Sequence, residues 1–238
     1  GQLLTGAEFT ISGMFYGETE ERDVPLTDQD NGEYVLPDDT LLADNSTYTL
    51  TEVKAPAGHE TSGPWTISVE DEQVTINNSE IDVDANNHFT YTIENSFVPL
   101  NLNVTKVSAT DQKTPLAGAR FALSSQDSNT KYEVSNENGK LSFTGLMPGD
   151  YLLEETVAPN GYQISASTWN FTIDINGQVT DEQNEFSVDS DGITINKEVT
   201  NSLKAFDLVV KKVNEVGKAI EGATFTLTNQ ETQELLEA

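Results

Sequence analysis

The chain has 238 residues, with 40 acidic against 12 basic side chains and a formal net charge of −28. Lys and Arg must neutralise phosphates for nucleic acid to bind, so this charge argues against a nucleic-acid partner. An anionic membrane surface would also repel the chain, and no apolar run approaches the roughly 18 to 20 residues of a bilayer span, so we expect no membrane insertion in this segment. The absence of cysteine excludes disulfides, thiol nucleophiles and cysteine zinc sites.

Short segments of alternating apolar and polar residues recur along the chain, each bounded by Asn, Asp, Gly or Pro. In chain order they include YTLTEV at 48–53, WTISV at 65–69, HFTYTI at 88–93, LNVTKV at 102–107, WNFTIDI at 169–175 and FDLVV at 206–210. A period of two predicts half-buried strands separated by turns. Only the acidic segment QETQELLEA at 230–238 has a helical period, so the sequence predicts an all-β fold.

Internal repeats organise these strands. The string LLTGAEFTI at 3–11 recurs as PLAGARFAL at 115–123 and as AIEGATFTL at 219–227, and YTLTEVKAPAGHE at 48–60 recurs as YLLEETVAPNGYQ at 151–163. One repeat is therefore about 105 residues, the size of a seven-strand sandwich. The registers predict a first repeat at 1–98 that lacks its opening strand, a complete second repeat at 99–203, and the first strands of a third repeat at 204–238. We expect a window of a longer tandem array, in which short joints make neighbouring repeats of the same chain partners in a stiff rod.

Lysine occupies an apolar position of two predicted strands. Lys106 shares its parity with Leu102 and Val104, and Lys212 stands at the equivalent position of the third repeat. Alternate residues of a strand face one side of the sheet, so both lysines are expected to point inward. An inward lysine must snorkel out, form an ion pair or lose its proton.

Carboxylates have similar inward positions at Glu155 and, in the first repeat, Glu52. A carboxyl and an amine that meet in a core can exchange a proton, which leaves a neutral, nucleophilic amine. The side-chain amide of Asn201, on the last strand of the second repeat, is the electrophile. If Lys106 and Glu155 meet in the core, Asn201 would offer the amide that a neutral amine could attack.

These residues carry a resemblance to a known family. The second repeat has every specified residue of the motif Y-x-L-x-E-T-x-A-P-x-G-Y, from Tyr151 to Tyr162, with LNVTK before it and TNS after it. It resembles the B-type repeats of Gram-positive collagen adhesins (Cna B-type) and the SpaA-like pilin domains. The resemblance implies tandem immunoglobulin-like or prealbumin-like Greek-key β-sandwiches, here one complete and two partial. It also implies an extracellular, cell-surface location, with anchoring to the cell wall in the full-length protein.

The same resemblance implies a role for each inward residue. Lys106 and Asn201 would join as an intramolecular isopeptide bond, assisted by Glu155 as the catalytic acid and base. The first repeat keeps Glu52 and Asn95, but its lysine is expected upstream of this chain. Lys212 is the reverse case, a nucleophile without a Glu or Asn partner. These residues would form incomplete sites, and the strand that bears Lys212 is the one that the first repeat lacks.

The resemblance implies a structural stalk or shaft module of a Gram-positive cell-surface adhesin or pilin, and three other functions are alternatives to it. Lys106 and Glu155 as an ordinary salt bridge would leave no crosslink. Turnover catalysis is not expected, because His59 and His88 have no catalytic or metal-type spacing, and the Glu155 chemistry is a single-turnover self-modification. A ligand-binding adhesin module, with a host extracellular protein or glycan at the insertion 12–45, is the alternative, as is a calcium-stabilised one. No acidic cluster has a full calcium-loop spacing, so no metal site and no cofactor are predicted.

Overall fold

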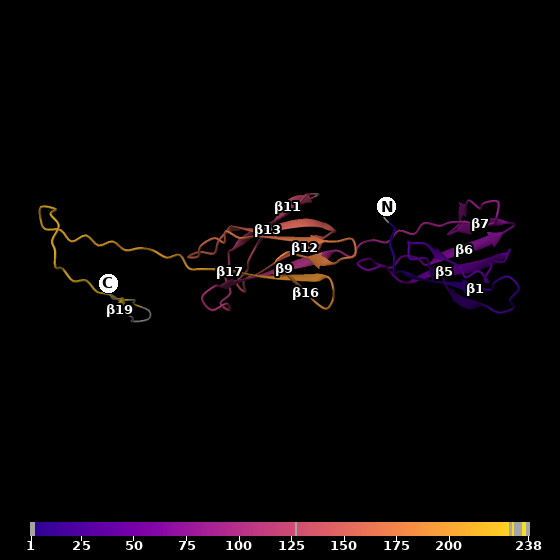
Figure 1. The fold of residues 1–238 in the computed structure, drawn as a ribbon, viewed down its shortest axis with the longest axis horizontal. Helices are drawn as coiled ribbons and strands as arrows, with labels where there is room; N and C mark the ends of the chain where they lie inside the picture. The colour runs from indigo at the N-terminus through magenta and orange to yellow at the C-terminus, as the bar shows by residue number, and fades with distance from the viewer. Residues whose placement is uncertain (1–2, 127, 229, 231–234, 237–238) are drawn as a thin grey trace. The chain divides into compact units, whose positions relative to one another are not determined.

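The computed structural model describes residues 3–126, 128–228, 230 and 235–236. These residues contain strands, turns and bends but no helix, as the sequence predicted. Contacts divide the chain into two units, Gly1–Leu203 and Lys204–Ala238. The first unit contains two bodies with separate hydrophobic cores, which are called the first repeat and the second repeat below (Figure 1).

The first repeat is built on one antiparallel sheet of six strands in the order β2-β1-β5-β6-β7-β8. Their bounds are Glu8–Gly13 for β1, Arg22–Pro25 for β2, Ser46–Lys54 for β5, Trp65–Glu70 for β6, Gln73–Ile76 for β7 and Ser79–Ile81 for β8. A two-stranded ribbon, β3 (Thr27–Asp28) with β4 (Tyr34–Val35), lies in the predicted insertion. On each of the strands β1, β5 and β6, alternate residues point into one core, in which Ile11, Tyr48 and Ile67 are buried. This is what the period of two requires.

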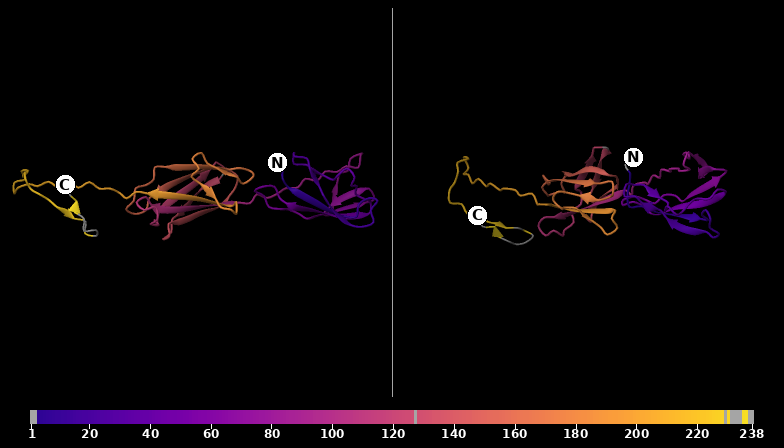
Figure 2. Two further views of the ribbon diagram at one scale, coloured as in Figure 1. Left: turned by 60° about the horizontal axis from the view of Figure 1, so that its bottom comes forward. Right: turned by 45° about the vertical axis from the view of Figure 1, so that its right-hand side comes forward.

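The second repeat is a sandwich of two sheets, seen as facing layers in Figure 2. One sheet has the order β11-β10-β13-β14-β15, and the other has the order β12-β9-β17-β16. The bounds are Leu100–Ser108 for β9, Arg120–Ser125 for β10, Ser128–Val134 for β11, Lys140–Leu146 for β12, Gly149–Val157 for β13, Thr168–Ile173 for β14, Val179–Thr180 for β15, Ser187–Val188 for β16 and Thr194–Asn201 for β17. The first strand, β9, and the last strand, β17, pair in parallel, so the first and last segments of the repeat lie side by side in one sheet.

Two of the predicted strands are absent. Residues 88–93 and residues 206–210 belong to no strand, whereas the other four predicted segments lie in β5, β6, β9 and β14. In the second repeat the equivalents of the two missing strands are β17 and β9, which bond to each other. Strand pairing needs a partner backbone, and neither segment has one among the described residues. A period of two thus indicates that a segment can form a strand, but it does not indicate whether a neighbouring strand is present to pair with it.

The C-terminal unit holds a short pair of strands, β18 (Leu227–Thr228) with β19 (Leu235–Leu236). An isolated bridge joins Val213 to Ala219, and the backbone N–H of Ile220 donates to the carbonyl of Lys212 at 3.0 Å. Most of the segment 230–238, which has a helical period, lies outside the described residues, and its described residues Leu235–Leu236 form strand β19 instead of a helix.

Candidate functional site

Three strands of the second repeat position the predicted site. Lys106 lies on β9, Asn201 on β17 and Glu155 on β13, which belongs to the other sheet. Along the β9–β17 pair Val199 is opposite Lys106 and Asn201 is opposite Ser108, so Lys106 and Asn201 share a face. Their exposed fractions are 0% for Lys106, 3% for Asn201 and 5% for Glu155. All three side chains are thus buried, as parity predicted for Lys106 and Glu155.

Hydrogen bonds hold the amide and the carboxylate together. The Nδ2 of Asn201 donates to the Oε2 of Glu155 at 2.8 Å and also donates to the carbonyl of Gln163. The backbone N–H of Ser165 donates to the same carboxylate oxygen at 2.7 Å. The loop that follows β13 therefore holds both groups through its backbone atoms.

Lys106 points its amine along β17. Its Nζ donates to the carbonyl of Val199, two residues before Asn201, at 3.0 Å. Among the described residues it forms no ion pair, so the ordinary salt bridge with Glu155 is not formed. Burial lowers the pKa of Lys106 to about 8, and the charge of Glu155 acts in the opposite direction. The neutral amine is therefore far more populated near neutral pH than for an exposed lysine.

Two oxygens of the site have no hydrogen-bond partner. They are the Oε1 of Glu155 and the Oδ1 of Asn201, both fully buried. A buried polar atom without a partner costs about 1–3 kcal/mol. Such a cost in a structure that is otherwise well bonded is typical of a reactive site.

The first repeat reproduces half of this arrangement. The Nδ2 of Asn95 and the backbone N–H of Ser62 each donate to the Oε2 of Glu52 at 2.7 Å. The Oε1 of Glu52 is buried without a partner, like that of Glu155. Lys54 does not replace the missing lysine, because its Nζ forms an exposed ion pair with Glu8 at 3.0 Å. The site therefore has an acid and an acceptor but no amine.

Lys212 is exposed in the C-terminal unit. Its backbone carbonyl accepts from Ile220, as the carbonyl of Lys106 accepts from Leu116 at 2.9 Å. The local backbone around the two lysines is thus alike, although only Lys106 is enclosed by a sandwich.

A second buried lysine, Lys197 on β17, was not predicted from the sequence. Its Nζ lies 3.2 Å from a carboxylate oxygen of Glu185 and stands 5.1 Å and 5.3 Å from the ring centres of Trp169 and Phe186. The ion pair and the two rings stabilise the charged form of its amine, which is not a nucleophile. The parity of Lys197 with the buried Val199 was the signal that would have identified it.

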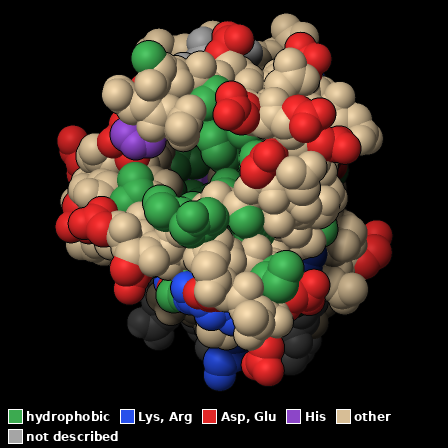
Figure 3. Space-filling view, turned by 90° about the vertical axis from the view of Figure 1, so that its right-hand side faces the viewer, with side chains coloured by type: hydrophobic (Ala, Val, Ile, Leu, Met, Phe, Trp, Pro, Cys, Tyr) green, Lys and Arg blue, Asp and Glu red, His purple; other side chains and the backbone are tan. Residues whose placement is uncertain are grey.

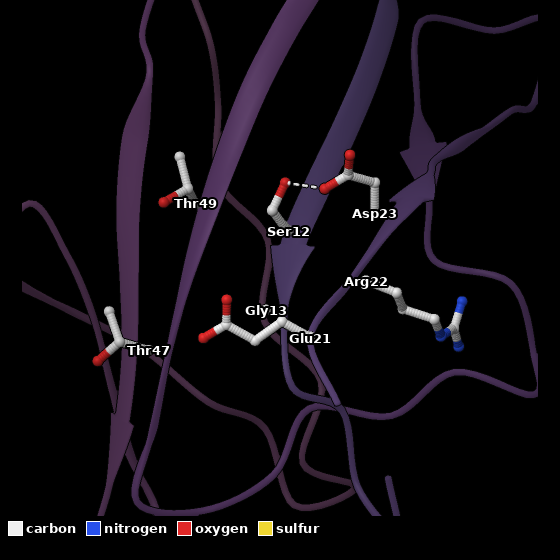
Figure 4. Close-up of a pocket in the computed structure, with 7 residues that line it drawn as sticks. All are labelled: Ser12, Gly13, Glu21, Arg22, Asp23, Thr47 and Thr49. Carbon is white, nitrogen blue, oxygen red and sulfur yellow. Dashed lines mark hydrogen bonds between the residues drawn. The ribbon is translucent and has the colours of Figure 1, made fainter. Parts of the chain in front are cut away.

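The predicted insertion borders an open, polar hollow of about 420 Å³ on the first repeat (Figure 4). It is lined by Ser12, Gly13, Glu21, Arg22, Asp23, Thr47 and Thr49. The hydroxyl of Ser12 donates to Asp23 at 2.6 Å, and no aromatic ring for stacking on a sugar is among these lining residues. The hollow therefore has no specific feature of a ligand site.

The carboxylates of the acidic clusters accept hydrogen bonds from backbone N–H groups of the turns in which they lie. Asp84 accepts from the backbone of Asn86 and His88, and these two bonds are the main reason that its pKa is lowered. Asp191 accepts from the backbone of Ile193 and Thr194 in the same way. The described part of the chain contains no group of three or more His, Cys, Asp or Glu arranged to hold a metal ion. It also contains no helix long and apolar enough to cross a membrane.

A family model described as SpaA, a prealbumin-like fold domain, matches residues 1–95 and 101–186. The two matched segments make up well over half of the chain and fall on the two bodies of the first unit. No curated protein matches the chain significantly.

Several solved structures are also similar. The C-terminal fragment of the pilus adhesin SpaC from Lactobacillus rhamnosus GG is 17% identical over 85% of this chain and 91% of its own, with a TM-score of 0.45. The Bacillus anthracis TIE protein is 24% identical over 85% of this chain, with a TM-score of 0.43. The group B streptococcus pilus 2b backbone protein is 17% identical over 84% of this chain and 80% of its own, with a TM-score of 0.38. This chain spans only 31% of the TIE protein chain.

Proposed function

The chain belongs to the SpaA family of prealbumin-like fold domains, and on that basis we propose that it is a structural stalk or shaft module of a Gram-positive cell-surface adhesin or pilin. Its second repeat is stabilised by an isopeptide bond between Lys106 and Asn201 that forms without an enzyme. The module is extracellular and works next to other repeats of the same array. No cysteine is present, so this bond supplies a covalent brace that needs no oxidising compartment.

The observation that carries this proposal is the buried hydrogen bond between Asn201 and Glu155, with the amine of Lys106 bonded to the carbonyl of Val199, two residues before Asn201. The carboxyl group of Glu155 is hydrogen-bonded to the nitrogen that would leave, so it is in place to transfer a proton to that nitrogen. A buried amine with a lowered pKa is in place to attack.

The chemistry is an amide exchange. The neutral Nζ of Lys106 attacks the Cγ of Asn201, and a new C–N bond forms as the bond from Cγ to Nδ2 breaks. Glu155 takes the proton that Nζ loses and delivers it to Nδ2, which leaves as ammonia. One amine and one primary amide thus become one secondary amide and one ammonia, with no oxidant or cofactor.

Intact mass tests the bond directly. We expect the purified chain to be lighter than its sequence by the mass of one ammonia, because Nδ2 of Asn201 is lost. Lys106→Ala and Glu155→Ala should each have the full mass of their own sequence, since one lacks the nucleophile and the other the proton carrier. Lys113→Ala, on an exposed turn, is the matched control and should still lose ammonia. A wild-type chain of unmodified mass would refute the bond.

The rate of bond formation should depend on pH through Lys106. Because burial lowers its pKa to about 8, the neutral amine grows about tenfold per pH unit below that value and little above it. Chain recovered in an unfolded, unreacted form would be refolded at a series of pH values, and ammonia loss would be followed by mass. The rate should rise with pH and level off near 8. A rate that climbs to the ordinary lysine value of 10.5 would show that the reacting amine is not desolvated.

A further inference from the structure

The buried amide of Asn201 is hydrogen-bonded through its nitrogen. Its Nδ2 donates to the Oε2 of Glu155 at 2.8 Å and to the carbonyl of Gln163. Both partners are acceptors, so they fix the nitrogen on their side and place the Oδ1 on the other side of the amide. That Oδ1 is buried and has no hydrogen-bond partner. The amide is thus held in position while its oxygen is left without a donor.

The proposed reaction places a negative charge on this oxygen. When the Nζ of Lys106 attacks the Cγ of Asn201, an electron pair of the C=O bond moves to Oδ1, and it returns as the bond to Nδ2 breaks. Water solvates the carboxylates on the surface, such as those on the face drawn in Figure 3, but Oδ1 is enclosed in the core. A buried charge without a partner is costly. Acyl transfer at such a site therefore depends on a donor aimed at the oxygen.

The residue opposite Asn201 in the sheet is Ser108. It is the last residue of β9, and it pairs with Asn201 in the parallel register of β9 and β17. The backbone N–H of Ala109 donates to the carbonyl of Asn201 at 2.9 Å, so the pairing is kept up to the ends of both strands. Paired strands lie about 4.8 Å apart. Ser108 and Asn201 are therefore neighbours on one face of the sheet.

The hydroxyl of Ser108 is buried and has a free proton. Ser108 shares the parity of Lys106 and is 4% exposed. Its Oγ accepts from the N–H of Thr110 at 3.3 Å, and in the part of the chain that the structure describes its own proton goes to no acceptor. A hydroxyl has one donor proton and two acceptor lone pairs, so the bond from Thr110 leaves the donor available. A buried donor without an acceptor thus lies beside a buried acceptor without a donor.

The other polar groups of the site have roles that exclude this one. The Oε2 of Glu155 accepts from the amide nitrogen, and the proton that Glu155 takes from the amine is needed by that leaving nitrogen. The N–H of Ser165 already donates to the same carboxylate at 2.7 Å, and Gln163 contributes a carbonyl. Among the described groups that form the site, the hydroxyl of Ser108 is the donor without an assigned partner.

We propose that the hydroxyl of Ser108 is the oxyanion donor of the reaction between Lys106 and Asn201. As Nζ attacks, the O–H of Ser108 turns to the Oδ1 of Asn201 and stabilises the charge that forms there. It donates a hydrogen bond and gives up no proton, so the proton still passes from Nζ through Glu155 to the leaving ammonia. This role rests on the isopeptide chemistry proposed above and adds a catalytic residue to it.

Ser108 also has a structural role that the test must separate from catalysis. Its Oγ accepts from Thr110, two residues later, as serine commonly does in turns. Backbone bonds fix the same turn, because the N–H of Ser108 donates to the carbonyl of Thr114 at 2.9 Å and its carbonyl accepts from Gln112 at 2.8 Å. Ser108→Ala should therefore keep the register of β9 while it removes the donor.

The test is the rate of ammonia loss when the full chain is refolded, followed by intact mass. Ser108→Ala should react about 10²–10³ times more slowly than wild type, the usual effect of removing one oxyanion donor. Ser108→Thr keeps a hydroxyl and should stay close to the wild-type rate, whereas Ser108→Cys donates weakly and should fall between the two. Ser202→Ala, which removes an exposed hydroxyl next to Asn201, is the matched control and should react as wild type.

The pH profile distinguishes a donor from a packing role. In wild type the rate should level off near pH 8, to which burial lowers the pKa of Lys106. Loss of the donor leaves that amine buried, so Ser108→Ala should be slower at every pH and level off at the same pH. A levelling point that moves toward 10.5 would show that Ser108 only keeps water away from Lys106, and it would overturn the proposal.

Uncrosslinked chains show what the hydroxyl contributes to folding. Lys106→Ala and the double variant Lys106→Ala with Ser108→Ala both lack the bond, so their melting temperatures differ only by the structural role of Ser108. If the double variant does not fold, the comparison of Ser108→Thr with Ser108→Cys carries the test. Equal rates in these two variants would overturn the proposal.

The outcomes separate this proposal from the one on which it rests. A wild type that never loses ammonia would reject the Lys106–Asn201 bond and the role of Ser108 with it. A wild type that loses ammonia, with Ser108→Ala equally fast, would keep the bond and reject only the donor.

Discussion

Glu155→Gln is expected to lower the melting temperature of the second repeat by about 16 to 40 °C. Lys106 and Asn201 are 95 residues apart, so their bond closes a loop of that length in the unfolded chain. By analogy with disulfides this closure contributes about 4–5 kcal/mol, and 1 kcal/mol shifts the melting temperature of a domain of this size by about 4–8 °C. Glutamine keeps the volume of Glu155 and accepts a hydrogen bond from Asn201, but it carries no proton for the reaction.

Calorimetry of the full chain provides an internal control for this prediction. The first repeat lacks the amine, so its transition should stay at the same temperature in wild type and variant. Intact mass would verify that the variant has kept its ammonia. A second-repeat transition that does not move, in a variant shown to be uncrosslinked, would contradict the stabilising role of the bond.

The second large effect is mechanical. Force enters the second repeat at β9 and leaves it at β17, and in a parallel pair these ends pull the two strands lengthwise past each other. A bond from Lys106 to Asn201 bypasses the residues between them, so they should not extend under load. In Glu155→Gln the same load should unfold the repeat and release about 300 Å of chain, at roughly 3.3–3.6 Å per residue.

Single-molecule force spectroscopy of the chain, held at its two ends, measures this difference. The first repeat has no crosslink and should unfold in one long step in every variant, so the wild type should show one long step fewer than Glu155→Gln, and Lys113→Ala should behave as wild type. An equal number of long steps in crosslinked wild type and in the variant would show that the load does not pass through the bond.

Much of the candidate site could be predicted from the sequence. Parity placed Lys106 inside with Leu102 and Val104, and the structure buries all three. The repeat registers related Asn95 to Asn201 and Glu52 to Glu155, and each pair makes the same hydrogen bond. These features depend on the alternation of residues in one strand or on the spacing of repeats, and both can be read directly from the sequence.

Other features depended on neighbours that no period records. Lys197 has inward parity like Lys106, but its charged amine is balanced by the carboxylate of Glu185 and the ring of Trp169. Lys106 has no ion-pair partner and donates to a backbone carbonyl instead. The carbonyl of Val199 as partner of Lys106, and the loop atoms of Gln163 and Ser165 that hold the amide and the carboxylate, were likewise unseen.

The sequence alone determined the all-β class, the repeats and the direction in which each strand residue faces, because the alternation of side chains is a property of a single strand. Only the tertiary structure decided which of these segments became strands. Residues 88–93 and 206–210 have the pattern of β17 and β9, yet they remain unpaired, because a ladder needs two backbones and the pattern of one strand does not supply the other. The same limit applies to chemistry, since Glu52 and Asn95 lie together without an amine while Lys212 stands exposed.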